Sequence, residues 1–416
     1  MDETNDNGYQ CLRIKVINRD HFNMESYKEI MMNADNLYES ALLAIKSSKD
    51  KYQTKKFSRH IFEHISLAQK ELLNQTWEIE NVKPFLISER GHKRKIQGNT
   101  PHDRMIMNCF CNKILIPALE PYLIYDNYAS REGKGTSQRR ERFEYFLHRA
   151  FREYGSNDFL VLLLDLSKFY DNMQHRVIKS KIMPKLNDDA YCGYILDTIL
   201  KSFEVNVSFM TDEQYATCLD DKYISLEHID DQIDIATPKW MAKSVNIGAL
   251  PSQTISTFFL TDNIDNYFKT VKGIKPYGRY QDDIFIIDNR KDFLNECLND
   301  FRKKCHEDKL FPNDKKSQIH PVSKPFKFLN RIYRMTETGH LEIHLSQDTV
   351  YREKRKLKKL HGLYISGEKE FSLIENQYKS WREQFRKYMT HSQLQTLDST
   401  YNSLFIESFV RGEDYE

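Results

Sequence analysis

The chain has 416 residues, 29% of them charged and 40% hydrophobic, which is typical of a folded protein and excludes a disordered one. Its formal net charge is only +2, from 62 Lys and Arg against 60 Asp and Glu, so the total charge gives no support to a nucleic-acid partner. The longest apolar run, 159–164, is too short for a membrane span, and the first residues lack a secretory pattern, so we expect no membrane partner and a cytoplasmic location. Seven cysteines without metal-site spacing are expected to be reduced thiols.

The first third of the chain is expected to be mostly helical. Residues 1–55 are predicted to form an N-terminal helical extension, and apolar residues spaced by three or four predict one amphipathic helix over 55–73. Residues 77–96 contain β-forming residues, then a turn and a basic stretch, which predicts a basic β-hairpin. Buried helices are expected over 103–119 and 141–154.

The rest of the chain combines strands and helices. Residues 159–166 predict a short apolar strand, and the next clear strand and turn lie at 279–287. Between them, 211–234 holds eight acidic residues and one Lys, which predicts an exposed loop or subdomain. From Tyr351 the pattern is helical, with six Lys or Arg in nine residues. Because no repeat or low-complexity linker marks a boundary, we expect one continuous assembly with lobes.

Two clusters of acidic residues interrupt apolar strands. Asp282 and Asp283 lie within 279–287, where they are expected at the tip of a hairpin, and Asp165 follows the strand at 159–164. A solvated turn is the usual explanation of one acid pair, but an acid at the exit of a second buried strand is costly without a partner. Two strand ends with carboxylates can converge on Mg²⁺ ions, and paired ions favour phosphoryl transfer.

These motifs together resemble those of the reverse transcriptases, specifically the bacterial ones. Asp165 with Tyr170 is similar to the family's first palm motif, and 279–284 (RYQDDI) to its YxDD box. The other matches are the second palm motif at 247–256, the fourth at 311–320, the primer-grip hairpin at 325–333, and two fingers motifs at 93–108 and 128–136. Seven elements in family order are far more specific than any one of them.

The resemblance implies an α+β fold, the right-hand polymerase fold with fingers, a palm built on an antiparallel sheet with helices, and a helical thumb. After the N-terminal extension, the fingers would span 56–155, the palm 156–335 and the thumb 336–416. The palm would carry the acidic insert, around 205–240. From the length after 335 we expect a thumb without an added nuclease.

The resemblance also implies the catalytic residues. Asp165, Asp282 and Asp283 would hold two Mg²⁺ ions, with the backbone carbonyl of Leu166 as a further oxygen ligand. Tyr170 would be the steric gate, an aromatic face that excludes a ribose 2′-hydroxyl and so favours dNTPs. A core tyrosine is the alternative for Tyr170.

Further positions are implied to bind the nucleotide. Arg94, with Lys93 beside it, would grip the triphosphate, since a guanidinium suits bidentate phosphate contact, although a solvated basic turn is the alternative. Gly248 would let the backbone approach the nascent base pair, and Gln253 would hydrogen-bond to template or nucleotide unless it is only a polar residue at a helix start. Lys316 would lie beside the leaving pyrophosphate, with Lys315 as the fallback and a solvated loop as the alternative.

Basic residues of the fingers and thumb are expected to contact nucleic acid. In the thumb they would make electrostatic backbone contacts with a template–product duplex, unless they form only an exposed charged helix. The predicted set is Lys134, Arg352, Lys354, Arg355, Lys356, Lys358 and Lys359.

Departures from the common motifs bear on the subgroup. Gln281 replaces the commoner Ala or Met of the YxDD box, a change that bears on nucleotide selection and fidelity. Ser252-Gln253 in the second palm motif resembles the motif of diversity-generating retroelement enzymes and of some defence-associated ones. The first hypothesis is an anti-phage defence enzyme that copies a dedicated non-coding RNA into cDNA from dNTPs, with a protein partner or homo-oligomer possible. The second is a diversity-generating retroelement enzyme, and the third a catalytically silent palm that binds nucleic acid.

Overall fold

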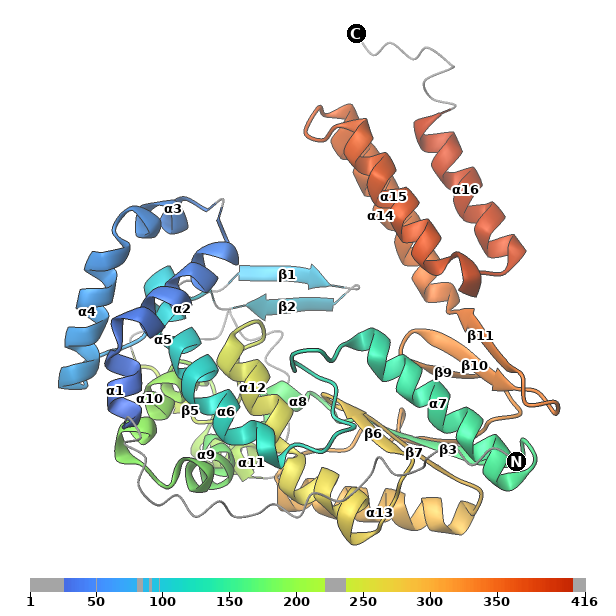
Figure 1. Cartoon of the computed structure of the whole chain (residues 1–416), viewed down its shortest axis with the longest axis horizontal. Helices are drawn as coiled ribbons and strands as arrows, with labels where there is room; N and C mark the ends of the chain where they lie inside the picture. Colours follow the sequence, from blue (N-terminus) through green and yellow to red (C-terminus); the bar gives the residue numbers. More distant parts are fainter. Residues whose placement is uncertain are drawn as a thin grey trace, which may run out of the picture.

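The computed structural model describes residues 26–49, 51–80, 85–89, 92–96, 98–220 and 237–406. N-terminal helices and a β-hairpin lie to one side of a central sheet, and a bundle of helices stands at the C-terminal end (Figure 1). The strands pair antiparallel within every named sheet, and the helices pack around them. The predicted α+β fold class is confirmed.

Five helices pack together at the N-terminal side. They are α1 (Tyr27–Met32), α2 (Ala34–Lys46), α3 (Tyr52–Arg59), α4 (Ile61–Asn74) and α5 (Pro101–Phe110). The side chain of Asn33 accepts hydrogen bonds from two N–H groups and so caps the start of α2. The single helix predicted over 55–73 is wrong, because His60 takes a non-helical conformation (φ −122°, ψ 30°) and separates α3 from α4.

The predicted hairpin is present as β1 (Phe85–Glu89) and β2 (His92–Ile96), which pair from Phe85 opposite Ile96 to Glu89 opposite His92. The helices expected over 103–119 and 141–154 are also present. They are α5 continued by a π-helical turn, η1 (Cys111–Leu115), and α6 (Ile116–Leu119), and then the long α7 (Thr136–Tyr154). A short 3-10 turn, η2 (Glu120–Tyr122), follows α6.

The central sheet lies within the range predicted for the palm and has the strand order β6-β7-β3-β8. Its strands are β3 (Leu160–Leu164), β6 (Tyr277–Tyr280), β7 (Asp283–Asp288) and β8 (Gln318–Pro321). Alternate residues of β3 and β7 belong to two different apolar cores, one containing Phe143 and Phe146 of α7 and the other Leu294 and Phe301 of α13 (Lys291–Glu307). Because helices cover both faces, β3 reads as a continuous apolar run.

The remaining palm helices connect these strands. They are α8 (Phe169–Asn172), α9 (His175–Ile182), η3 (Met183–Leu186), α10 (Ala190–Lys201), α12 (Leu250–Phe259) and the π-helical turns η6 (Thr261–Asp265) and η7 (Tyr267–Val271). Within the described residues, six cysteines are buried and free, as predicted. No helix in the described part of the chain is long and apolar enough to cross a membrane.

The described part of the acidic insert is a small subdomain. β4 (Val205–Asn206) pairs with β5 (Trp240–Met241), and α11 (Asp212–Asp220) lies between them in sequence. Val207, Met210 and Cys218 form an apolar cluster of their own with Met241. The insert's residues 221–236 lie outside the described residues.

A three-stranded sheet joins the palm to the C-terminal helices. Its strands are β9 (Phe326–Phe328), β10 (Arg331–Met335) and β11 (Leu341–Leu345), and the following helices are α14 (Gln347–Ile365), α15 (Phe371–Phe385) and α16 (His391–Phe405), with η8 (Arg386–Tyr388) between the last two. The three α-helices share an apolar core that includes Leu357, Ile374 and Leu397. The predicted thumb range from 336 thus begins inside the β10–β11 hairpin.

Candidate active site

The strand register brings the two acidic clusters together. Leu164, the last residue of β3, pairs with Ile284 of β7, so Asp165 and Asp283 occupy the next opposed positions. Across the β6–β7 hairpin Tyr280 pairs with Asp283, which leaves Gln281 and Asp282 as the turn. Gln281 adopts φ +53°, in the left-handed region, as tight two-residue hairpin turns require. The hairpin tip therefore carries its acids to the end of β3, as the sequence predicts.

Asp165 is held by the loop that precedes β8. Lys316 Nζ donates to Asp165 Oδ1 at 3.1 Å, and Asn313 Nδ2 donates to Asp165 Oδ2 at 2.9 Å. The Asn313 N–H also donates to the Asp165 carbonyl oxygen at 2.8 Å. The predicted Lys316 thus lies at the acid, whereas Asn313 was not predicted; its position two residues after Phe311, within the fourth motif, was the available signal.

The three acids influence one another electrostatically. Burial, and next the negative charges of Asp283 and Asp165, raise the pKa of Asp282 to about 7. Added positive charge near these acids would therefore stabilise their ionised forms. In this structure Lys316 lies against Asp165, and the Arg139 guanidinium lies 3.7 Å from Asp283 Oδ2.

The donor set suits a hard divalent cation. Mg²⁺ prefers a few carboxylate oxygens and completes its shell with water and phosphate. Hydrogen bonds fix the backbone on both sides of Leu166. The Asn313 N–H donates to the Asp165 carbonyl, and the Ser167 N–H donates to the Phe311 carbonyl. Across the described residues, however, no group of three or more His, Cys, Asp or Glu side chains is arranged to hold a metal ion, so the Mg²⁺ ligands stay a prediction.

A buried ion pair stabilises the β6–β7 hairpin next to its turn. Arg279 and Asp265 are both 0% exposed, and Arg279 Nη2 lies 2.7 Å from Asp265 Oδ2. The Tyr277 hydroxyl donates to the same carboxylate, and Arg279 Nη1 donates to the Gln281 carbonyl at 3.1 Å. Removing one partner of such a pair would leave a buried charge alone, so this network fixes the start of the turn.

The predicted steric gate is tied to the hairpin turn by its hydroxyl. Tyr170 Oη lies 3.2 Å from Ser256 Oγ, and Ser256 Oγ donates to Gln281 Oε1 at 2.9 Å. Gln281 Nε2 donates in turn to Ser130 Oγ at 3.4 Å. Tyr170 is half-buried beside Phe169 on α8, the short helix that follows Asp165 in the chain. Neither Ser256 nor Ser130 was predicted, because their link to Tyr170 exists only through the fold.

The second palm motif leads into α12. Gly248 is exposed with φ +104°, a conformation that favours glycine, and Gln253 is half-buried in the first turn of the helix. The Gln253 N–H donates to the Ala249 carbonyl at 3.2 Å. The structure thus places Gln253 at a helix start, and its contact with template or nucleotide stays a prediction.

The predicted basic residues of the fingers differ in how far the structure describes them. Lys93 and Arg94 lie on β2, opposite Ser88 and Ile87, and their side chains lie outside the described residues. Lys134 Nζ donates to the Tyr125 carbonyl at 2.5 Å and stacks on the Tyr125 ring, and burial lowers its pKa to about 8. Lys134 is therefore engaged within the protein in this structure.

The basic residues of the thumb all lie on α14. Arg352 donates to Thr349 Oγ1 at 2.9 Å, and Lys356 pairs with the buried Glu353 at 3.1 Å. Lys354 is half-buried. The remaining three are exposed along the helix: Arg355, Lys358 and Lys359.

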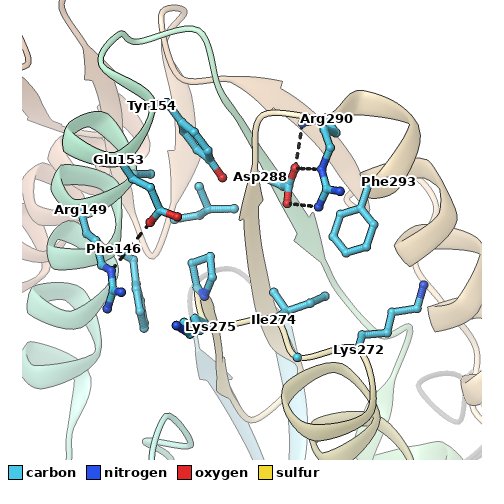
Figure 2. Close-up of a pocket in the computed structure, with 14 residues that line it drawn as sticks. Phe146, Arg149, Glu153, Tyr154, Lys272, Ile274, Lys275, Asp288, Arg290 and Phe293 are labelled. Atoms are coloured by element: carbon cyan, nitrogen blue, oxygen red, sulfur yellow. Dashed lines mark hydrogen bonds and ion pairs between the residues drawn. The ribbon is translucent and has the colours of Figure 1, made fainter. Parts of the chain in front are cut away.

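A cavity of about 260 Å³ lies at the other end of the β6–β7 hairpin, between α7, the turn at 272–276 and the start of α13 (Figure 2). Charged side chains on its wall pair with one another, Arg290 with Asp288 at 3.0 Å and Arg149 with Glu153 at 3.9 Å. The cavity is separate from the carboxylates, since Asp283 and Asp288 are the opposite ends of β7.

Comparison with known proteins identifies the family. Residues 89–331 match the reverse transcriptase (RNA-dependent DNA polymerase) family. The match covers more than half of the chain and includes Asp165, Asp282 and Asp283. The chain belongs to the reverse transcriptases. The predicted family is thereby confirmed, while the bacterial, defence-associated subgroup stays a prediction. A search of curated proteins with this reverse transcriptase sequence finds no match.

The search of solved structures returns telomerases at low similarity. The structure of telomerase from Candida albicans with a TWJ fragment of telomeric RNA is 13% identical, with a TM-score of 0.43, and the match covers 80% of this chain. Apo telomerase from Candida tropicalis is 12% identical, with a TM-score of 0.44 and 84% of this chain covered. The reverse transcriptase chain spans 60% of the first of these chains and 68% of the second.

Proposed function

We propose that this chain is an active RNA-directed DNA polymerase that copies a dedicated non-coding RNA into cDNA, in the cytoplasm, as part of bacterial anti-phage defence. The observation that supports the polymerase chemistry is the register that places Asp165 beside Asp283, with Asp282 in the adjoining turn. The family match supports an RNA template and dNTP substrates.

In the proposed reaction, Asp165, Asp282 and Asp283 would hold two Mg²⁺ ions, with the Leu166 carbonyl as a further ligand. When bound, the two ions lower the cost of the charge that develops on the attacking 3′-hydroxyl and on the leaving pyrophosphate. Lys316 is 67% exposed at its side chain, so it can turn from Asp165 toward the phosphates. The Tyr170 ring faces the sugar, and Lys93 and Arg94 of the fingers hairpin meet the triphosphate.

The defence assignment has narrower support than the chemistry. Three features support the defence assignment: the acidic insert, the first motif in its Ser-Lys-Phe-Tyr-Asp-Asn form at 167–172, and a thumb of three helices. Ser252-Gln253 after Gly248 supports the alternative of a diversity-generating retroelement enzyme. A silent nucleic-acid-binding palm is disfavoured because all three acids are present.

The polymerase chemistry is tested by incorporation of labelled dNTP with Mg²⁺ and the RNA that co-purifies with the protein. Replacing both acids of the hairpin tip (Asp282→Asn with Asp283→Asn) should reduce the rate by at least about a hundredfold, since these acids would hold the ions that stabilise transition-state charge. Asp292→Asn, at an exposed carboxylate of α13, is the matched control and should keep the native rate. Native incorporation by the double variant would overturn the catalytic assignment.

Sequencing the RNA and DNA bound to the purified protein tests the biological role. A single abundant non-coding RNA with complementary cDNA is expected for defence. A template repeat matched to a mutated variable repeat would instead establish diversification, and bound RNA without any cDNA would support the silent palm.

A further inference from the structure

Arg139 of α7 is a buried cation beside the acids that none of the sequence motifs accounts for. Its side chain is 7% exposed, and its Nη1 lies 3.7 Å from Asp283 Oδ2, at ion-pair distance but too far for a hydrogen bond. Within the described structure, its Nε and Nη1 have no hydrogen-bond partner. A buried guanidinium with two unpaired donors is costly, and an apolar side chain of the same size would usually be as stable there. Fold stability therefore does not explain this arginine.

Aromatic rings fix the orientation of the guanidinium. The Arg139 Cζ lies 3.9 Å from the Tyr280 ring centroid and 5.9 Å from that of Phe328 on β9. Tyr280 and Asp283 are the opposed pair that closes the catalytic hairpin. A single flat cation can therefore stack on Tyr280 while its edge faces Asp283.

Two cations flank the acids, and they differ in freedom. Lys316 at Asp165 is 67% exposed, so solvent or substrate can draw it away. Arg139 at Asp283 is buried among α7, the hairpin and β9. Asp283 thus has a buried positive charge at ion-pair distance from one of its two oxygens, while its side chain as a whole is 43% exposed.

We propose that Arg139 is a positioning residue for Asp283. The guanidinium attracts Oδ2 toward α7, and so it keeps this carboxylate beside Asp282 and Asp165, where the three acids would hold a divalent cation. Without Arg139, the repulsion of the two neighbouring carboxylates turns Asp283 toward solvent. This inference rests on the proposed function, in which the three acids bind Mg²⁺.

The test measures metal binding directly, with Mn²⁺ as the probe. Mn²⁺ is titrated into the full chain without nucleotide or nucleic acid, and the free ion is followed by electron paramagnetic resonance. Arg139→Met should bind Mn²⁺ about 10–100-fold more weakly, the usual effect of removing the partner that orients a metal ligand. Arg139→Lys, which keeps the charge but not the flat group, should recover part of the loss. In dNTP incorporation, Arg139→Met should lower kcat and leave KM for dNTP nearly unchanged.

Arg140→Met is the matched control, because it removes the same charge from the next position of α7. The charged groups that act on the Arg140 pKa include Arg331, Tyr333 and Glu144 but none of the three catalytic-site acids. The Mn²⁺ affinity of Arg140→Met should therefore stay native. Thermal melting reports folding, and Arg139→Gln replaces Arg139→Met if the latter does not fold. Native Mn²⁺ affinity in the folded Arg139 variant would overturn the positioning role alone. A native chain that binds no Mn²⁺ would overturn the metal assignment of the proposed function as well.

Discussion

At the scale of single residues, a chain of hydrogen bonds links Tyr170, the proposed steric gate, to the hairpin turn. Ser256 is buried and has one hydroxyl proton, which it donates to Gln281 Oε1 or to the Gln253 carbonyl. Tyr170 must then donate its own proton to Ser256 Oγ. The unusual Gln281 of the catalytic box thus connects the turn that carries Asp282 to the proposed gate.

Tyr170→Ala should raise the use of rNTP relative to dNTP by about tenfold or more, because the aromatic face that excludes a 2′-hydroxyl is removed. Competition between labelled rNTP and dNTP on one template measures the ratio. Tyr170→Phe keeps the ring and serves as the control, so its discrimination should stay close to native. Unchanged discrimination in Tyr170→Ala would exclude a gating role.

His175 makes stability depend on pH. It is buried, its Nε2–H donates to the Ser244 carbonyl at 2.8 Å, and burial lowers its pKa to about 4 although Asp197 acts in the opposite direction. The unfolded chain, with an ordinary pKa near 6.5, binds more protons, so this contribution to stability is full above about pH 6.5 and is lost as pH falls toward 4. The loss is on the order of 3 kcal/mol.

Urea unfolding at pH 7.5 and pH 5 measures this dependence. His175→Gln keeps a donor for Ser244 but cannot titrate, so the difference in unfolding free energy between the two pH values should shrink. His340→Gln, at an exposed histidine, is the control and should behave as the native chain does. An equally steep pH dependence in His175→Gln would assign the effect to other groups.

At the scale of elements, α14 is the candidate duplex contact. We expect a triple variant, Arg355→Glu with Lys358→Glu and Lys359→Glu, to bind an RNA–DNA hybrid at least about tenfold more weakly. The slope of log affinity against log salt concentration should fall by up to about three, because binding releases fewer counterions when phosphate contacts are lost. The exposed residues Lys291, Arg302 and Lys303 of α13 give a triple variant with the same charge change. If both triple variants bind alike, α14 is not the contact.

At the scale of the whole molecule, the acids meet because distant segments share one sheet. β3 lies between β7 and β8, so the first acid, the hairpin acids and the Lys316 loop meet at one end of the strands. The opposed local charges explain the small net charge. Acids gather in the palm and the insert, whereas exposed basic residues follow α14, so a total of +2 is compatible with nucleic-acid binding.

The sequence by itself determined the fold class and the reverse transcriptase family, and it predicted that three acids meet at two strand ends, because apolar periodicity and motif order are local properties of the chain. It failed at the break between α3 and α4, where one residue, His60, leaves the helical conformation although the apolar spacing continues. Only the tertiary structure decided the partners of the acids. Arg139 lies outside every motif, and the motifs that contain Asn313 and Ser256 gave no sign of their contacts, since each reaches the site through strand register and helix packing between segments far apart in sequence.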